Sequence, residues 1–100
     1  MNSQRTENLL VVTLSEDLTA ASAENLKNEI LGEMDPDLDE VYLDLGGVEM
    51  VDSTGISLLI SIQNSLKKKS GTLSLLNTSD DIVSMFKLMR LDKYFQVSSR

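Results

Sequence analysis

The sequence predicts a single α/β domain, and three observations lead to that fold class. One hundred residues is the length of one ordinary domain, and 41% of them are hydrophobic, enough to build a core without disulfides or metal. Short apolar runs typical of strands alternate with segments of helical periodicity. No internal repeat, low-complexity tract or linker interrupts them. The order strand, helix, strand, helix, strand, helix favours helices covering a largely parallel or mixed sheet.

The first half of the chain contains two predicted strands and one predicted helix. Asn8–Leu14 is a run of leucine and β-branched residues typical of a buried strand. Residues 20–31 form the helix, whose apolar face consists of Ala23, Leu26, Ile30 and Leu31. Asp35-Pro36-Asp37 ends the helix because proline cannot continue the hydrogen-bond ladder. Val41–Leu45 is the second strand, and Gly46-Gly47 breaks it.

The longest predicted helix follows at Gly55–Lys69. Its apolar face is broad enough to lie against a sheet and consists of Ile56, Leu59, Ile60, Ile62 and Leu66. Three lysines, 67–69, occupy its last turn, where positive charge suits the helix dipole. We expect Gly71 to mark the exit from this helix, and Thr72–Leu76 to form the third strand.

A third helix and two weaker strands complete the prediction. Residues 78–81 resemble a capping box and open a helix with Ile82, Phe86 and Met89 on one side. Met85 and Met89 are expected in the core. The tail at Tyr94–Val97 is a candidate edge strand, and the residues before Asn8 are a candidate hairpin arm.

Composition excludes several classes of function. The chain has no cysteine and no histidine, so it lacks thiolate sites, the commonest general base and the commonest metal ligand. No apolar run reaches the roughly 18 residues of a membrane span, and Met1–Thr13 is too polar for a signal peptide. We therefore expect a soluble cytoplasmic domain that does not enter the membrane.

Charge is distributed unevenly along the chain. Residues 16–52 hold twelve acidic residues and a single base, Lys27, for a net charge of −11, whereas residues 53–100 have a net charge of +4. Such an asymmetry concerns partners more than fold. It argues against nucleic acid, which needs a basic face, and favours a partner with a basic patch. Solubility alone would also explain it.

Two motifs resemble ligand-binding loops but lack residues that such loops require. Residues 35–40 begin like a calcium loop, but the sixth position is Glu40 instead of glycine and the twelfth is Gly46 instead of glutamate. Gly46-Gly47 lacks the lysine and hydroxyl residue of a phosphate loop. We expect neither a metal nor a cofactor.

The segment Val51-Asp52-Ser53-Thr54-Gly55-Ile56 is the remaining candidate site. Asp52 or Ser53 would be the N-cap of the long helix. A hydroxyl there is exposed, free backbone amides favour an incoming phosphate, and about −2 of added charge would change the local field abruptly. An ordinary helix start explains the same residues. Catalysis by Ser53 is not expected, because an ionised Asp52 is a poor base and no histidine exists.

These residues also carry a family resemblance. Leu43-Asp44-Leu45, Val48 and Val51-Asp52-Ser53-Thr54-Gly55-Ile56 resemble the motif of the STAS domain in bacterial anti-sigma factor antagonists of the SpoIIAA and RsbV type. The likeness continues through Ser70-Gly71-Thr72-Leu73 to four apolar residues, Val83, Phe86, Leu91 and Phe95, and includes Ala23–Leu26 upstream. It implies one STAS domain over residues 1–100, with a core at roughly 8–97. The implied fold is a mixed sheet of four or five strands, with helices mainly on one side.

The resemblance also implies a switching cycle. A serine kinase that is itself the anti-sigma factor, a histidine-kinase-like ATPase, would phosphorylate Ser53. A PP2C-type phosphatase would remove the phosphate. The unphosphorylated form would bind the kinase and release its client, so the chain would be a substrate and not an enzyme. Thr54 should lie inside the first turn with its methyl group toward the core.

The partner face implied by the resemblance draws on the acidic segment. It comprises the loop before the first helix, the strand end at Met50–Asp52 and the start of the long helix, with the residues Glu16, Asp17, Thr19, Met50, Asp52, Thr54, Gly55 and Ile56. The family often has Gly-x-Leu-Asp in that loop. Here the stretch is Glu16-Asp17-Leu18-Thr19, so Thr19 replaces the aspartate, and Asp17 or Glu16 is expected to supply the charge. The alternative is a structural STAS subunit of a stressosome-like or lipid-transport assembly, without a phosphorylation cycle.

Overall fold

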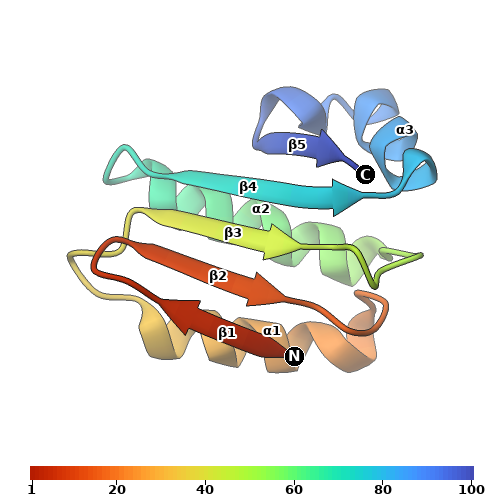
Figure 1. Cartoon of the computed structure of the whole chain (residues 1–100). Coiled ribbons are helices and arrows are strands. Elements are labelled where there is room, and N and C mark those ends of the chain that lie inside the picture. Colours follow the sequence, from red (N-terminus) through yellow and green to blue (C-terminus); the bar gives the residue numbers. More distant parts are fainter.

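The computed structural model describes residues 1–100 and consists of one five-stranded sheet with three α-helices (Figure 1). The predicted α/β class, with a mixed sheet, is confirmed. In chain order the elements are β1 Asn2–Arg5, β2 Leu9–Thr13, α1 Ala20–Glu33, β3 Glu40–Asp44, α2 Ser53–Lys67, β4 Thr72–Thr78, α3 Asp80–Leu88, a 3₁₀ turn at Leu91–Lys93 and β5 Gln96–Ser99.

The strand order in the sheet follows the chain order, β1-β2-β3-β4-β5. β1 is antiparallel to β2, and the other three pairs are parallel. Parallel neighbours need crossovers. α1 and α2 provide two of them on the same face of the sheet (Figure 1), and α3 lies in the third, between β4 and β5. The carboxyl ends of β2, β3 and β4 therefore meet at one edge of the sheet, where the loops to α1 and α2 begin.

The core lies between the sheet and the two long helices. Alternate strand residues point inward, as expected for a sheet covered on one face, and they meet the apolar stripes of α1 and α2. Among the completely buried side chains are Leu10, Val12, Val41, Leu43, Leu73, Leu75, Leu59 and Leu66. This packing fixes the positions of the two helix N-termini relative to the sheet edge.

Both weak strand predictions are confirmed, one with different bounds. The N-terminal arm pairs with β2 as β1. At the C-terminus β5 begins at Gln96, because Phe95 is buried and its ring packs edge-on against Phe86 at 5.5 Å between ring centres. Tyr94 and Phe95 thus belong to the core contacts of the 3₁₀ turn, and only Gln96 and Val97 of the expected strand are extended.

Two side-chain expectations were wrong, and the left-handed conformation expected of one glycine belongs to the residue before it. Leu31 is 58% exposed, because α1 buries a narrower stripe than its apolar residues suggest. Met89 is 48% exposed: α3 ends at Leu88, and Arg90 adopts a left-handed conformation (φ 60°) that turns the chain away. Gly71 follows the left-handed residue, which is Ser70 with φ 60°. Gly71 is instead a site of close approach, since a Cβ there would lie 2.3 Å from the carbonyl oxygen of Asp39.

Candidate functional site

Ser53 is the first residue of α2, at the edge where the parallel strands end. Asp52 is the N-cap, and its Oδ1 accepts a hydrogen bond from the backbone N–H of Gly55 at 2.9 Å. The predicted N-cap is therefore confirmed at Asp52, and the helix begins at Ser53, two residues before the predicted start at Gly55. Because Asp52 supplies the cap, the hydroxyl of Ser53 is not needed for it, and Ser53 is exposed.

The second carboxylate oxygen of Asp52 contacts the other long helix. Its Oδ2 accepts a hydrogen bond from the N–H of Ala20, the first residue of α1, at 2.9 Å. The bonds from Gly55 and Ala20 hold the pKa of the Asp52 carboxyl below its usual range. The amide of Ile56 donates to the Asp52 carbonyl at 2.9 Å. The expectation of free amides for a phosphate was thus wrong for Gly55 and Ile56.

Asp17 connects the same two regions in the opposite direction, from the loop before α1 to the loop before α2. It lies in the loop of residues 14–19 between β2 and α1, and its Oδ1 accepts hydrogen bonds from the amides of Glu49, at 2.8 Å, and Met50, at 3.2 Å. Those amides belong to the loop of residues 45–52 between β3 and α2. The backbones also pair, since Leu18 donates to the Met50 carbonyl at 3.0 Å and accepts from Asp52 at 3.1 Å. We call residues 14–19 and 45–52 together the loop platform.

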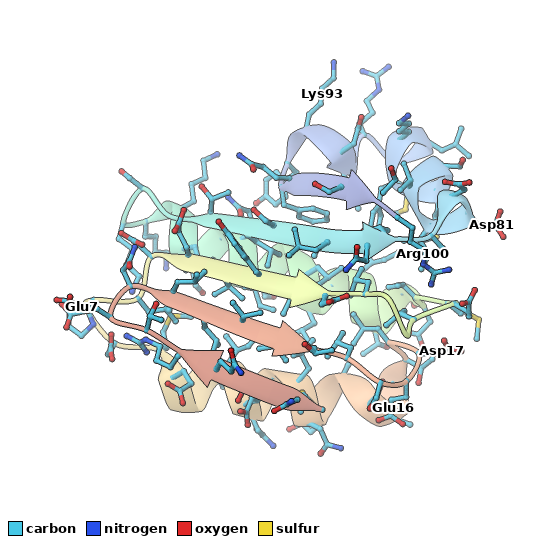
Figure 2. All side chains as sticks on the ribbon, viewed as in Figure 1. Glu7, Glu16, Asp17, Asp81, Lys93 and Arg100 are labelled. Atoms are coloured by element: carbon cyan, nitrogen blue, oxygen red, sulfur yellow. The ribbon has the colours of Figure 1, made fainter.

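Three of the predicted partner residues are exposed on or beside the loop platform. Glu16 is exposed and its side chain makes no hydrogen bond or ion pair, and Met50 is 54% exposed. Thr54 is exposed as well, so it lies outside the buried core toward which its methyl group was expected to point. Glu16 and Asp17 lie at the end of the molecule toward which the parallel strands point (Figure 2).

Three other predicted partner residues, Thr19, Gly55 and Ile56, are buried or half-buried. Gly55 and Ile56 are buried, and a Cβ on Gly55 would lie 2.6 Å from the carbonyl oxygen of Leu18. Thr19 is half-buried as the N-cap of α1, and its N–H donates to the Ser22 hydroxyl at 3.0 Å. The glycine after the hydroxyl pair is thus required by the close contact between α2 and the first loop.

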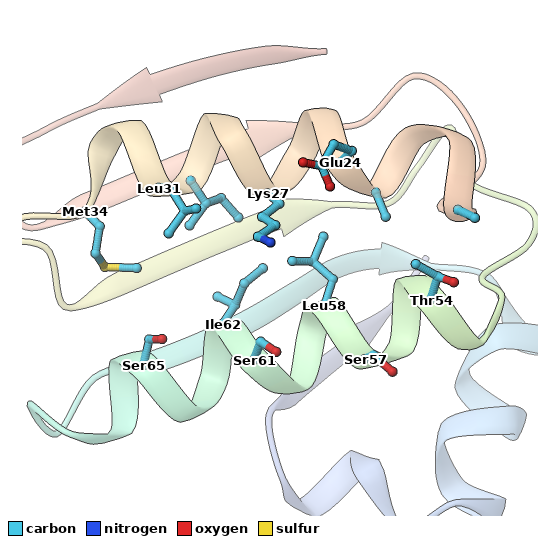
Figure 3. Close-up of a pocket in the computed structure, with 13 residues that line it drawn as sticks. Glu24, Lys27, Leu31, Met34, Thr54, Ser57, Leu58, Ser61, Ile62 and Ser65 are labelled. Carbon is cyan, nitrogen blue, oxygen red and sulfur yellow. The ribbon is translucent and has the colours of Figure 1, made fainter.

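Thr54 lines a groove between α1 and α2 that sequence reasoning missed. The groove has a volume of about 290 Å³ and extends from Ala20 and Thr54 to Met34 and Ser65. Its inner wall is apolar, with Leu31 and Leu58 pointing into the space between the helices (Figure 3). The serines spaced four residues apart on α2, Ser57, Ser61 and Ser65, were the sequence signal that could have revealed it.

The basic residue Arg100 lies at the same end of the molecule as Glu16 and Asp17 (Figure 2). Its Nη2 donates to the Gly46 carbonyl at 2.9 Å and pairs with Glu49 Oε1 at 3.2 Å. Fifty-one residues separate it from Glu49, so no local pattern could predict the contact. Arg100 ties β5 to the loop platform and partly offsets its negative charge.

Neither a metal centre nor a membrane span emerges from the structure. No group of three or more acidic side chains is arranged to hold a metal ion. None of the helices combines the length and apolar character needed to traverse a bilayer.

The family model for the STAS domain matches residues 1–100. The chain belongs to the STAS domain family. The match confirms the resemblance carried by residues 43–56 and spans the α1, α2 and loop-platform residues described above. No curated protein sequence matches this STAS domain.

Solved STAS domains share the fold at low sequence identity. TM1081 from Thermotoga maritima, described as a candidate anti-sigma factor antagonist, is 17% identical over 99% of this chain and 86% of its own, with a TM-score of 0.88. The anti-sigma factor antagonist SpoIIAA in its unphosphorylated form is 19% identical over 87% of this chain and 81% of its own (TM-score 0.74). The phosphorylated Bacillus form is 18% identical over 99% and 91% (TM-score 0.76).

A membrane transporter contains the same fold as one part of a longer chain. Murine Slc26a9, an anion transporter, is 20% identical over 96% of this chain but only 17% of its own, with a TM-score of 0.77. The STAS fold therefore occurs both in small regulators and in larger proteins.

Proposed function

We propose that this STAS domain is a phosphorylation-regulated anti-sigma factor antagonist. In its unphosphorylated form it binds a serine-kinase anti-sigma factor of the histidine-kinase-like ATPase type and releases the client. Phosphorylation of Ser53 ends binding, and a PP2C-type phosphatase restores it. The observation that carries the proposal is the position of Ser53: an exposed hydroxyl at the start of α2, beside an acidic loop platform. The likeness to SpoIIAA, an antagonist known in both forms, supports it.

The charge of one phosphate is sufficient for such a switch. The amides of Gly55 and Ile56 are already bonded to Asp52, so these two amides are not available to a phosphoryl group on Ser53. An acidic partner group about 4 Å away, at an effective dielectric constant near 20, would repel each unit of charge by roughly 4 kcal/mol. That corresponds to about a thousandfold loss of affinity. The fold need not change.

Exposure alone does not distinguish Ser53 from Thr54, since both are exposed. Their surroundings differ, because Thr54 lines the groove between the helices whereas Ser53 precedes it at the edge of the loop platform. The family resemblance supports the residue directly after the aspartate, Ser53, as the phosphoacceptor. A phosphopeptide map that located the phosphate on Thr54 would contradict this assignment.

We assign Ser53 the role of substrate and not of nucleophile. Asp52, the nearest acidic neighbour in sequence, has its two carboxylate oxygens bonded to backbone amides, and its lowered pKa makes it a weak base. No lysine or arginine forms a hydrogen bond with the Ser53 hydroxyl. The arrangement therefore suits a group that receives a phosphate from another protein's active site.

The decisive experiment measures modification and binding together. The chain is incubated with ATP and a candidate serine kinase of the histidine-kinase-like type, and the phosphorylated residue is mapped by mass spectrometry. Wild type, Ser53→Ala, Ser53→Asp and the phosphorylated chain are then titrated against the kinase. We expect tight binding by the first two, weak binding by Ser53→Asp and the weakest by the phosphorylated form. Equal affinity across the series refutes the proposal.

A second candidate function is a structural STAS subunit of a larger assembly, such as a stressosome-like scaffold or a lipid-transport complex. The observation that favours it is the occurrence of this fold within the Slc26a9 transporter. In that case candidate kinases leave the chain unmodified, and Ser53→Asp assembles as well as wild type does.

A further inference from the structure

We propose that Asp17 and Asp52 form a reciprocal carboxylate clamp that holds the loop platform in one geometry, acting as positioning residues rather than as contacts with the partner. The inference rests on the proposed function for the identity of the partner. It differs from the expectation drawn from the sequence, in which Asp17 or Glu16 supplies charge to a basic surface of the kinase and Asp52 belongs to the partner face.

The reciprocity is visible in the hydrogen bonds. Asp17, from the first loop, accepts from two amides of the second loop, at 2.8 and 3.2 Å. Asp52, from the second loop, accepts from the first amide of α1 at 2.9 Å, beyond the end of the first loop. Neither aspartate forms an ion pair, since the three ion pairs of the structure involve Arg5 and Arg100. Backbone N–H groups are thus the hydrogen-bond partners of both carboxylates.

The clamp satisfies amides that have no other acceptor. The N–H groups of Glu49 and Met50 make no backbone hydrogen bond, and the N–H of Ala20, at the first position of α1, has no helical acceptor. Hydrogen bonds to an ionised carboxylate are among the stronger ones in proteins. Apart from them, the two loops are joined by the backbone bonds of Leu18. The clamp therefore accounts for three of the five cross-connections named above.

Preorganisation links the clamp to binding. A partner that docks on the loop platform must order whatever part of it is mobile, and this ordering lowers affinity. Met50 carries a clamped amide, and Ser53 directly follows Asp52, so the positions of both exposed residues depend on the clamp. The hydrogen bonds to Asp17 and Asp52 thus fix Met50 and Ser53 in place, while the Glu16 side chain remains available to a partner.

Asparagine and serine variants separate geometry from charge. Asp17 uses a single oxygen, so Asp17→Asn retains a carbonyl acceptor and loses only the charge, whereas Asp17→Ala loses both. Asp52→Ser retains a cap for α2, because serine is a good N-cap, but is too short to supply the second acceptor for Ala20. Glu16→Gln is the matched control for charge, since that side chain holds nothing.

The first measurement uses the free chain and backbone amide exchange by NMR. We expect Asp17→Ala to speed exchange at Glu49 and Met50 roughly tenfold or more, the effect of losing one charged hydrogen bond. Glu16→Gln should behave as wild type, and Asp17→Asn, which keeps a neutral acceptor, should speed exchange much less than Asp17→Ala does. Asp52→Ser should speed exchange at Ala20 and leave Gly55 protected. Wild-type exchange rates at these amides in both Asp17→Ala and Asp52→Ser would refute the clamp. If Asp17→Ala does not fold, Asp52→Ser alone tests it.

The second measurement is affinity for the kinase that modifies Ser53. A clamp predicts that Asp17→Asn binds within about twofold of wild type and that Asp17→Ala binds roughly tenfold more weakly. Suppose that Asp17→Asn binds the kinase as weakly as Asp17→Ala does, although its amides remain protected from exchange. The charge of Asp17 would then contact the partner, and its role as a positioning residue would be refuted. If no kinase binds the wild-type chain, the proposed function fails, and amide exchange alone decides the clamp.

Discussion

Gly55→Ala tests how closely α2 packs against the first loop. A methyl group at this position would lie 2.6 Å from the carbonyl oxygen of Leu18, 2.9 Å from its Cγ and 3.0 Å from Cγ1 of Val51. Alanine favours a helix over glycine by about 1 kcal/mol, but overpacking of this kind costs about 1–3 kcal/mol. The displaced carbonyl also accepts the Asp52 amide at 3.1 Å, a bond that contributes about 1 kcal/mol.

The clash outweighs the helix propensity, so we expect a net destabilisation of about 1–3 kcal/mol. For a domain of this size that lowers the melting temperature by roughly 5–20 °C, measured by circular dichroism. Gly32→Ala in α1 is the matched control, because a Cβ there meets nothing within 4 Å, and it should raise stability by about 0.5–1 kcal/mol. A Gly55→Ala chain as stable as wild type would refute the close-packing argument.

The remaining predictions concern the core, the phosphoacceptor and pH. Phe86→Ala should cost about 3–5 kcal/mol in urea unfolding, because its ring is completely buried against Phe95; a loss below 1 kcal/mol would contradict this. Ser53→Asp should change stability by no more than about 0.5 kcal/mol, since Ser53 is exposed; unfolding of the variant would mean that charge acts on the fold. The lowered pKa of Asp52 means that its carboxylate stabilises the fold fully above the unfolded pKa of about 3.9. This contribution is lost as the pH falls through the lower folded value. The stability difference between wild type and Asp52→Asn should therefore shrink below about pH 4. A difference that does not depend on pH would argue against the hydrogen bonds from Gly55 and Ala20 to the Asp52 carboxylate.

Local patterns predicted the elements because each depends on neighbours in sequence. The run Asn8–Leu14 contains β2, and the spacing of Leu59, Ile62 and Leu66 marks the buried face of α2. The patterns failed where burial depends on distant segments. Leu31 and Met89 fit an apolar face, yet the space each would fill is solvent or a groove. Periodicity records which side of a helix a residue occupies and not whether another element covers it.

In the candidate site, too, the sequence predicted the features that depend on neighbouring residues and missed those that depend on distant segments. The hydroxyl after an aspartate at a helix start could be predicted, because N-capping is a local interaction. The roles of Asp17 and Gly55 could not: one carboxylate bonds to amides more than thirty residues away, and the glycine contacts the carbonyl of Leu18.

The sequence by itself determined the α/β class, the order of the elements, the place of Ser53 at a helix start and the acidic charge of the surrounding segment. The tertiary structure alone decided that Asp17 and Asp52 direct their carboxylates at backbone amides, that Arg100 reaches the loop of residues 45–52, and that a groove opens between α1 and α2. The physical reason is the range of the interactions. Helix and strand periodicity acts over a few residues, whereas the parallel strands bring loops thirty residues apart to one edge of the sheet, where their polar groups bond to each other.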